Sequence, residues 1–281
     1  METLRRVSEI RGFVATSRAQ SASIGFVPTM GALHAGHLAL VQAARAQCQR
    51  VIVSIFVNPT QFGPNEDFAA YPRDEAGDAR KLRDAGVDVL YMPDVSEMYG
   101  EGFSTSVRVK DLSQGLCGDF RPVHFEGVAT VVTKLLLQVL PDAAFFGEKD
   151  YQQLQIIKRL VRDLNILVRI ESVFTLREGD GLALSSRNLY LSPEERKIAP
   201  SLYRILKSAA EDIRGGQAVK ARVERAVADL RAAGFAKIDY LEVRDAQSLE
   251  PVAKLTRPAR LLAAAWLGRT RLIDNVAIET P

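Results

Sequence analysis

The run VIVSIFV at residues 51–57 constrains the fold of this chain more than any other segment. The run is almost wholly apolar and rich in β-branched side chains. A strand with one buried face alternates apolar and polar residues, whereas a continuously apolar strand is typical of a parallel sheet covered by helices on both faces. Because parallel strands are joined by crossover connections, usually helices, the flanking segments should alternate between strand and helix.

The chain up to about residue 175 follows this alternation. We expect strands over residues 24–28, 51–57, 87–91 and 143–146, and helices over residues 36–48, 74–85, 128–140 and from about 150. This succession predicts an α/β fold with a Rossmann-like, doubly wound parallel sheet. Ligands of such sheets bind beyond the carboxyl ends of the strands.

The pattern changes after about Phe174. Residues 177–181 form a turn-rich joint, and Ser192 is a predicted N-cap, with Pro193 at the first helical position and Glu195 completing a capping box. Helices are expected around 202–214 and 218–233, and short strands at 238–243, 260–267 and 271–278. We therefore predict a Rossmann-like domain over residues 1–175 and a smaller α+β domain over residues 176–281.

The composition argues against several function classes. The 37 Lys and Arg residues exceed the 34 Asp and Glu residues by a net charge of +3, which is too little to indicate a nucleic-acid-binding surface. Cys48 and Cys117 lack the C-x-x-C spacing, so neither a disulfide framework nor a zinc knuckle is indicated. The start lacks the apolar run of a signal peptide, and the most apolar stretch, 128–140, is shorter than the roughly 20 residues of a membrane span. We expect a cytoplasmic protein without a nucleic-acid or membrane partner.

The segment PTMGALHAGH, residues 28–37, places two of the three histidines between a strand and a helix. Backbone N–H groups and the helix dipole favour an anion at a helix start. There His34 and His37 would offer N–H donors to a phosphate, and Gly36 would let the phosphate approach the backbone. Two alternatives stay open: a metal pair with His124 as third ligand, and capping histidines without a further role.

Three other polar clusters follow predicted strands or turns. Lys149, in the stretch 147–150, is a mobile charge suited to polyphosphate, and Arg187 follows two serine hydroxyls that can bond phosphate oxygens. The amides of Gln61 and Gln153 suit a small hydroxylated carboxylate. The chain contains neither a Walker loop nor a G-x-G-x-x-G motif after a strand, so a nucleotide would be bound by a different set of residues.

Six ordered motifs together resemble the pantothenate synthetase (pantoate–β-alanine ligase) family, within the nucleotidyltransferase-like superfamily that carries the HxGH signature. They are PTMGALHAGH, SIFVNPTQFGPNEDFAAYPR, RPVHFEGVATVVTKL, FFGEKDYQQL, DGLALSSRN and AAWLGRTRLIDN, and they run from Pro28 to Asn275. In the gate loop that the resemblance implies over residues 118–127, Val123 stands where many relatives have Gly, and Glu126 where some have Arg.

The resemblance implies a two-step, ATP-dependent ligation of (R)-pantoate and β-alanine to pantothenate, in coenzyme A biosynthesis. Pantoate would form pantoyl adenylate and pyrophosphate, and β-alanine would then displace AMP. Mg²⁺ is implied as the escort of ATP, with no side chain assigned as a metal ligand, and a homodimer is expected. The C-terminal domain would close over the ATP site.

The resemblance also implies the site residues. His37 would be the proton donor, and His34, Lys149 and Arg187 the other catalytic residues. Gln61 and Gln153 would bind pantoate, with Asn58 and Tyr71 as further substrate contacts, and Gln61 would also meet β-alanine. The implied ATP site comprises Met30, Gly31, Ala32, Leu33, His34, Ala35, Gly36, His37, Gly147, Glu148, Lys149, Asp150, Leu176, Leu184, Ser185, Ser186 and Arg187.

Two other functions compete with this interpretation. An adenylyltransferase relative would stop after nucleotidyl transfer, but such relatives typically lack the pair Gln61 and Gln153 and this C-terminal domain. A non-catalytic nucleotide-binding module would retain ATP affinity without turnover. The intact set of His34, His37, Lys149 and Arg187 argues against such a module.

Overall fold

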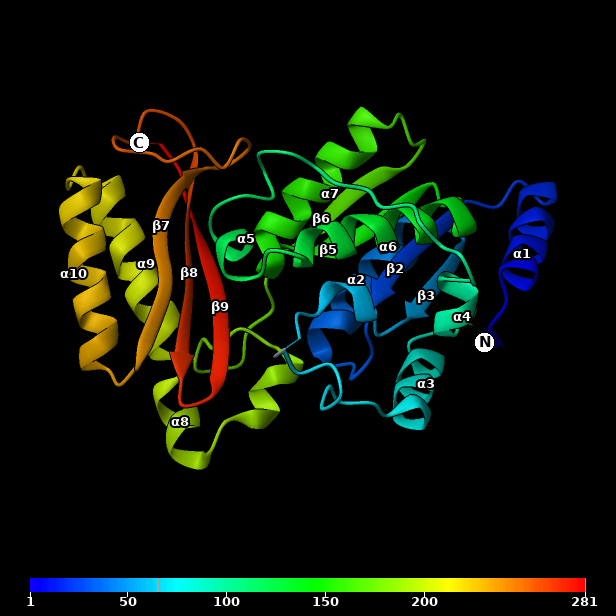
Figure 1. The fold of residues 1–281 in the computed structure, drawn as a ribbon, viewed down its shortest axis with the longest axis horizontal. Helices are drawn as coiled ribbons and strands as arrows, with labels where there is room; N and C mark the ends of the chain where they lie inside the picture. Colours follow the sequence, from blue (N-terminus) through cyan, green and yellow to red (C-terminus); the bar gives the residue numbers. More distant parts are fainter. Residues whose placement is uncertain (65, 281) are drawn as a thin grey trace. The chain divides into compact units, whose positions relative to one another are not determined.

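The chain divides into two compact units in a computed structural model that describes residues 1–64 and 66–280 (Figure 1). The first unit comprises Met1–Ser113, Arg121–Glu148 and Ile156–Phe174, and the second comprises Gln114–Phe120, Lys149–Gln155 and the chain from Thr175 onward. Asn65, which falls within the motif at 54–73, lies outside the described residues. Two short stretches that precede residue 175 therefore pack with the C-terminal part.

A six-stranded sheet forms the centre of the first unit and confirms the predicted Rossmann-like class. Its order is β1 (Glu2–Leu4), β4 (Val89–Tyr91), β3 (Arg50–Ile55), β2 (Ile24–Thr29), β5 (Ala143–Gly147) and β6 (Arg169–Val173), with every neighbouring pair parallel. The chain runs outward from β2 through β3 in one direction, and β5 lies on the other side of β2. The carboxyl end of β2 is therefore a topological switch point, the usual place for a ligand.

The strands are central because they are apolar on both faces. Val51, Ile52 and Val53 of β3 are buried, as the continuous apolar run predicts, and Val27 of β2 and Phe145 of β5 are fully buried. The helices before residue 175 include α1 (Val7–Ala19), α2 (Ala35–Gln47), α3 (Glu75–Asp84), α4 (Val95–Met98), α6 (His124–Val139) and α7 (Tyr151–Asp163), with the 3₁₀ turns η1 (Pro59–Gln61) and η2 (Glu148–Asp150).

The segment over residues 118–127, expected to be a loop, is helical for most of its length. Residues Cys117–Phe120 form helix α5, and α6 begins at His124, four residues before the predicted start at Val128. Phe125 and Val128 are both buried in the first unit, so packing extends the helix into a polar sequence that lacks a helical pattern of its own. Only residues 121–123 connect the two helices.

The second unit is a smaller α+β structure, as predicted. Strands β7 (Lys237–Asp245), β8 (Ala259–Leu267) and β9 (Thr270–Ile278) form an antiparallel sheet in that order, and α9 (Ser201–Arg214) and α10 (Val219–Ala232) share its hydrophobic core. Helix α8 (Pro193–Ile198) begins with the predicted capping box, in which Glu195 N–H donates to Ser192 Oγ at 3.2 Å and Ser192 N–H donates to Glu195 Oε2 at 2.8 Å.

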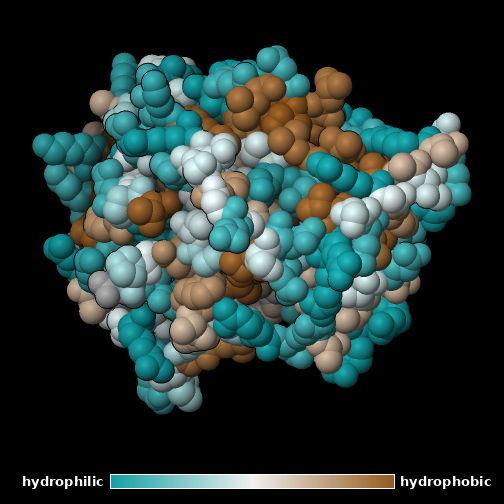
Figure 2. All heavy atoms as spheres, turned by 45° about the vertical axis from the view of Figure 1, so that its right-hand side comes forward, coloured by the Kyte–Doolittle hydropathy of each residue, from teal (hydrophilic) through white to brown (hydrophobic). Residues whose placement is uncertain are grey.

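Hydrophobic residues gather in patches on the otherwise largely hydrophilic face shown in Figure 2. Large hydrophobic side chains that are at least half exposed in the first unit include Leu137, Leu140, Leu164 and Leu167. Apolar surface of this kind is compatible with a contact between proteins, and the homodimer stays a prediction. Within the described residues, no helix combines the length and the apolar character needed to cross a membrane.

Candidate active site

The turn between β2 and α2 contains two residues in the left-handed backbone region, one of which is a glycine with little space for a side chain. Gly31 and Ala32 have positive φ angles of 85° and 50°, and a Cβ atom at Gly31 would lie only 3.1 Å from the side chain of Ile55. The Thr29 hydroxyl donates to the Ser54 carbonyl on β3 at 2.7 Å and accepts from Gly31 N–H at 3.2 Å. The chain therefore reverses tightly at the carboxyl end of β2, held to the neighbouring strand.

His34 and His37 both cap the start of α2, each through its own Nδ1. Gly36 N–H donates to His34 Nδ1 at 3.1 Å, and His34 N–H donates to His37 Nδ1 at 3.3 Å, with the ring centroids 4.1 Å apart. A nitrogen that accepts from a backbone N–H carries no proton, so in each neutral ring the proton lies on Nε2. Capping and anion binding, which the sequence left as alternatives, are thus compatible: Nδ1 caps, and Nε2–H can donate to a phosphate.

The buried carboxylate of Asp78 and the partly exposed Lys81, whose role the sequence reasoning missed, hold the residue before His34. Leu33 N–H donates to Asp78 Oδ1 at 2.8 Å, and Lys81 Nζ donates to the Leu33 carbonyl at 2.8 Å. The Asp78 side chain is only 2% exposed, and Lys81 lies 3.4 Å from it. Both residues lie on α3, whose charged pattern indicates a solvated helix face, so the sequence carries no signal for this role.

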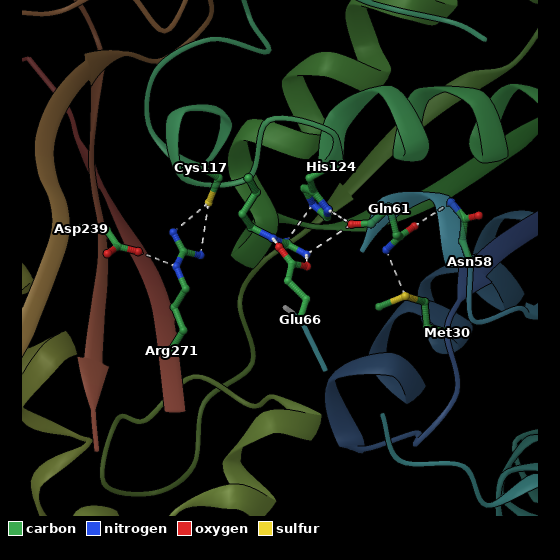
Figure 3. A network of polar contacts seen from close by, with 9 residues as sticks. Met30, Asn58, Gln61, Glu66, Cys117, His124, Asp239 and Arg271 are labelled. Atoms are coloured by element: carbon green, nitrogen blue, oxygen red, sulfur yellow. Dashed lines mark hydrogen bonds and ion pairs between the residues drawn. The ribbon is translucent and has the colours of Figure 1, made fainter. Parts of the chain in front are cut away.

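Gln61, a predicted pantoate ligand, is surrounded by polar partners in the first unit (Figure 3). Its Nε2 donates to Met30 Sδ at 3.0 Å, and its Oε1 accepts from Asn58 Nδ2 at 3.2 Å. Asn58 is 1% exposed, so the hydrogen bond that holds the Gln61 side chain comes from a buried amide. Tyr71 is also buried, with its ring edge-on to Phe62 at 5.9 Å. The structure therefore brings Met30, Asn58 and Gln61 together.

Gly127 of α6 lets the 3₁₀ turn η1 approach the helix backbone. A Cβ atom at Gly127 would lie 2.5 Å from the Thr60 carbonyl oxygen and 2.7 Å from Gln61 Cα, which real Cβ atoms essentially never do. The Gly127 carbonyl also accepts from Asn58 Nδ2 at 3.1 Å. This close approach explains a glycine inside a helix, where it otherwise costs about 1 kcal/mol relative to alanine.

His124, the third ligand in the metal alternative, uses both ring nitrogens within the protein. Its Nδ1 lies 3.0 Å from the Gln61 carbonyl oxygen, and its Nε2 lies 3.1 Å from Arg121 Nη1. Across residues 1–64 and 66–280, no group of three or more His, Cys, Asp or Glu side chains is arranged to hold a metal ion.

The predicted site residues are divided between the two units. The first unit holds Met30, Gly31, Ala32, Leu33, His34, Ala35, Gly36, His37, Asn58, Gln61, Tyr71, Gly147 and Glu148. The second unit holds Lys149, Asp150, Gln153, Leu176, Leu184, Ser185, Ser186 and Arg187.

Two of the second unit's predicted phosphate-binding residues have local supports. Lys149 is in η2, its Nζ lies 3.8 Å from Asp150 Oδ2, and its carbonyl accepts from Asn275 Nδ2 at 3.0 Å. Ser185 caps the 3₁₀ turn η3 (Ser186–Tyr190), since its Oγ accepts from Arg187 N–H at 3.3 Å. Asn275, which belongs to a recognised motif but had no predicted role, thus fixes the main chain of Lys149.

A hairpin brings Leu176 and Leu184 together. Leu184 N–H donates to the Leu176 carbonyl at 3.0 Å. Between them Arg177 donates to both carboxylate oxygens of Asp274, at 2.6 and 2.8 Å, and its guanidinium lies 3.6 Å from the Tyr203 ring centroid. The ion pair links the hairpin to β9, and the sequence alone did not reveal it.

A separate polar cluster ties α5 to the sheet of the second unit (Figure 3). Arg271 Nε donates to Asp239 Oδ2 at 2.8 Å, and its two terminal nitrogens lie 3.6 Å from Cys117 Sγ. The Cys117 thiol also lies 3.1 Å from the Tyr240 hydroxyl, whose pKa is raised by burial. Both cysteines are free thiols.

Comparison with known proteins places the chain in one family. A family model described as pantoate-beta-alanine ligase matches residues 2–277. The pantothenate synthetase of Paramagnetospirillum magneticum is 58% identical over 276 residues, covering 98% of this chain and 97% of the relative. That of Rhodospirillum rubrum is 56% identical over 275 residues, covering 98% of each.

Solved structures agree with the sequence comparison. Pantothenate synthetase from Thermus thermophilus is similar with a TM-score of 0.94 and 48% identity, over 99% of this chain and 100% of that one. Pantoate-beta-alanine ligase from Francisella tularensis, complexed with beta-gamma ATP and beta-alanine, has a TM-score of 0.84 and 37% identity, over 100% and 99% of the two chains. The chain described here belongs to the pantoate–β-alanine ligase family.

Proposed function

We propose that the protein joins (R)-pantoate and β-alanine into pantothenate, using ATP and passing through pantoyl adenylate, as a step toward coenzyme A. The observation that carries the proposal is the histidine pair at the switch point of the sheet, where each ring accepts a backbone N–H at Nδ1 and so carries its proton on Nε2. The family membership and the Francisella tularensis relative, which was solved with beta-gamma ATP and beta-alanine, support it.

In the first proposed step, a carboxylate oxygen of pantoate attacks the α-phosphorus of ATP. The new oxygen–phosphorus bond makes a mixed anhydride of pantoate and AMP, the bond from the α-phosphorus to the β-phosphate oxygen breaks, and pyrophosphate leaves. Negative charge builds on the phosphoryl oxygens, which the Nε2–H groups of His34 and His37 are proposed to stabilise as hydrogen-bond donors. Lys149 and Arg187 are proposed to bind the phosphates, and Mg²⁺ to enter with ATP.

In the second step, the amine of β-alanine attacks the activated carbonyl carbon. The amide bond forms, the carbon–oxygen bond to the phosphate breaks, AMP leaves, and the ammonium proton is released. Gln61 and Gln153 are proposed to hold pantoate through their amides, and Gln61 also to meet β-alanine. The homodimer and the cytoplasmic location remain predictions.

Product analysis tests the function directly. We expect AMP only when ATP, pantoate and β-alanine are all present, and pyrophosphate with ATP and pantoate alone. A protein of the adenylyltransferase type would yield a nucleotide product and pyrophosphate without AMP. A protein that binds ATP without forming either product would contradict the proposal.

Replacing Lys149 with alanine is expected to raise KM for ATP by about 10- to 100-fold, because a hydrogen bond to a charged group contributes about 1.5–3 kcal/mol. KM for pantoate should change much less. Steady-state kinetics with each substrate varied in turn measures both. Lys220→Ala removes the same charge from an exposed position on α10 and should leave both constants unchanged. Equal losses for ATP and pantoate in Lys149→Ala would contradict the assignment.

A further inference from the structure

Glu66, Arg121 and His124 form a continuous polar chain that ends on the main chain of Gln61, and Figure 3 labels Glu66, His124 and Gln61. We call these three residues the support cluster. Arg121 Nε and Nη2 donate to the two carboxylate oxygens of Glu66, at 2.8 and 2.5 Å. Arg121 Nη1 contacts His124 Nε2, and His124 Nδ1 contacts the Gln61 carbonyl. The cluster belongs to the motifs 54–73 and 121–135, but none of its residues has a role in the two proposed chemical steps.

The contacts of His124 determine which ring nitrogen carries the proton. A guanidinium can only donate, so Nε2 must accept from Arg121, and a carbonyl oxygen can only accept, so Nδ1 must donate to Gln61. A neutral ring satisfies both contacts at once. His124 is only 8% exposed, so breaking either contact would leave a polar group buried.

Glu66 balances the charge of Arg121 beside this neutral ring. Burial by itself disfavours the ionised carboxylate, but hydrogen bonds and charge from Arg121 outweigh burial and hold the pKa of Glu66 below its ordinary value. The Arg121 and Glu66 side chains are 15% and 24% exposed. The pair is therefore partly shielded from water, and it fixes the direction of the guanidinium that faces His124.

Gln61 needs this external support because its own turn is weak. It ends a three-residue 3₁₀ helix whose backbone bonds are long, 3.5 Å from Gln61 N to the Asn58 oxygen and 3.3 Å from Phe62 N to the Pro59 oxygen. Short 3₁₀ turns have poor hydrogen-bond geometry. The Gln61 carbonyl is instead held by His124 at 3.0 Å and approached by Arg121 Nη2 at 3.5 Å.

We propose that the support cluster consists of positioning residues that hold Gln61 in place for the hydroxy acid. The inference rests on the proposed function, in which Gln61 binds pantoate. The histidine turn is anchored separately by Asp78 and Lys81. Loss of the cluster should therefore weaken pantoate binding and leave ATP binding nearly unchanged.

Two conservative variants of His124 test the proposal. In His124→Asn the amide nitrogen can occupy the place of Nδ1 and still donate to the Gln61 carbonyl, whereas His124→Gln places its amide near Nε2 and loses that bond. We expect KM for pantoate to rise about tenfold or more in His124→Gln and much less in His124→Asn, because in His124→Gln the buried Gln61 carbonyl keeps only the 3.5 Å contact from Arg121 Nη2. KM for ATP should stay within about twofold in both. Thermal unfolding verifies that each variant is folded.

Each outcome decides one proposal. If the wild-type protein forms no AMP from pantoate and β-alanine, the proposed function fails. If it does, but both variants have the wild-type KM for pantoate, or raise KM for ATP equally, the positioning role fails. Nitrogen NMR of the labelled wild-type protein, with the His124 signals assigned by their loss in His124→Asn, tests the geometry without any turnover. We expect a proton on Nδ1 of His124, and a proton on Nε2 instead would overturn the inference.

Discussion

Replacing His37 with asparagine is expected to slow pantoate-dependent pyrophosphate release by about 10²–10³-fold, the usual loss when one donor to a developing oxyanion is removed. Asparagine can still accept from His34 N–H near the position of Nδ1, so the start of α2 keeps its cap, but nothing replaces the Nε2–H donor. A pyrophosphate-coupled assay, with ATP and pantoate saturating, measures the rate.

His37→Gln is the matched control, because its amide can donate near the position of Nε2 while the cap to His34 is lost. We expect His37→Gln to retain more activity than His37→Asn although it caps the helix less well. The reverse order would show that the ring acts through the helix start alone. The same pair of substitutions at His34, whose Nδ1 accepts from Gly36 N–H, decides which histidine contributes more to the first chemical step.

Replacing Gly127 with alanine is expected to lower the free energy of unfolding by about 2 kcal/mol, within the usual range for overpacking. The added methyl group would meet the backbone of Thr60 and Gln61, which cannot move away without displacing η1. KM for pantoate should rise as well, because Gln61 moves with this turn. Urea unfolding and steady-state kinetics measure the two effects.

Gly12 supplies the control for this substitution. It lies inside α1 with nothing within 4 Å of a Cβ atom built on it, so Gly12→Ala should stabilise the protein by up to about 1 kcal/mol through helix propensity alone. If Gly127→Ala were as stable as the wild type, the close approach would have no energetic consequence. That result would contradict the explanation given for this glycine.

The sequence predicted those parts of the fold whose physical signal is local. The apolar run at 51–57 produced a buried central strand, and Ser192 and Glu195 formed their capping box. The HxGH segment was correctly expected between a strand and a helix. In each of these cases the residues that decide the structure are neighbours along the chain.

The parts that the sequence did not predict depend on contacts between distant residues. Asp78 and Lys81 look like solvated helix residues until the Leu33 backbone is placed between them. Helix α6 extends to His124 because Phe125 is buried, which no helical pattern in the polar stretch indicates. The short edge strand β1 contains only three residues and forms by pairing with β4.

The anchors of the histidine turn also have a consequence for folding. Leu33 is held by side chains that lie 45 and 48 positions further along the chain. Contacts of such separation form only after the intervening chain has been ordered, at the cost of loop-closure entropy. The segment through α3 must therefore be in place before the turn acquires its final shape. Any ligand that requires this shape will stabilise α3 as well, so ligand binding reports on the folding of a helix that the ligand need not touch.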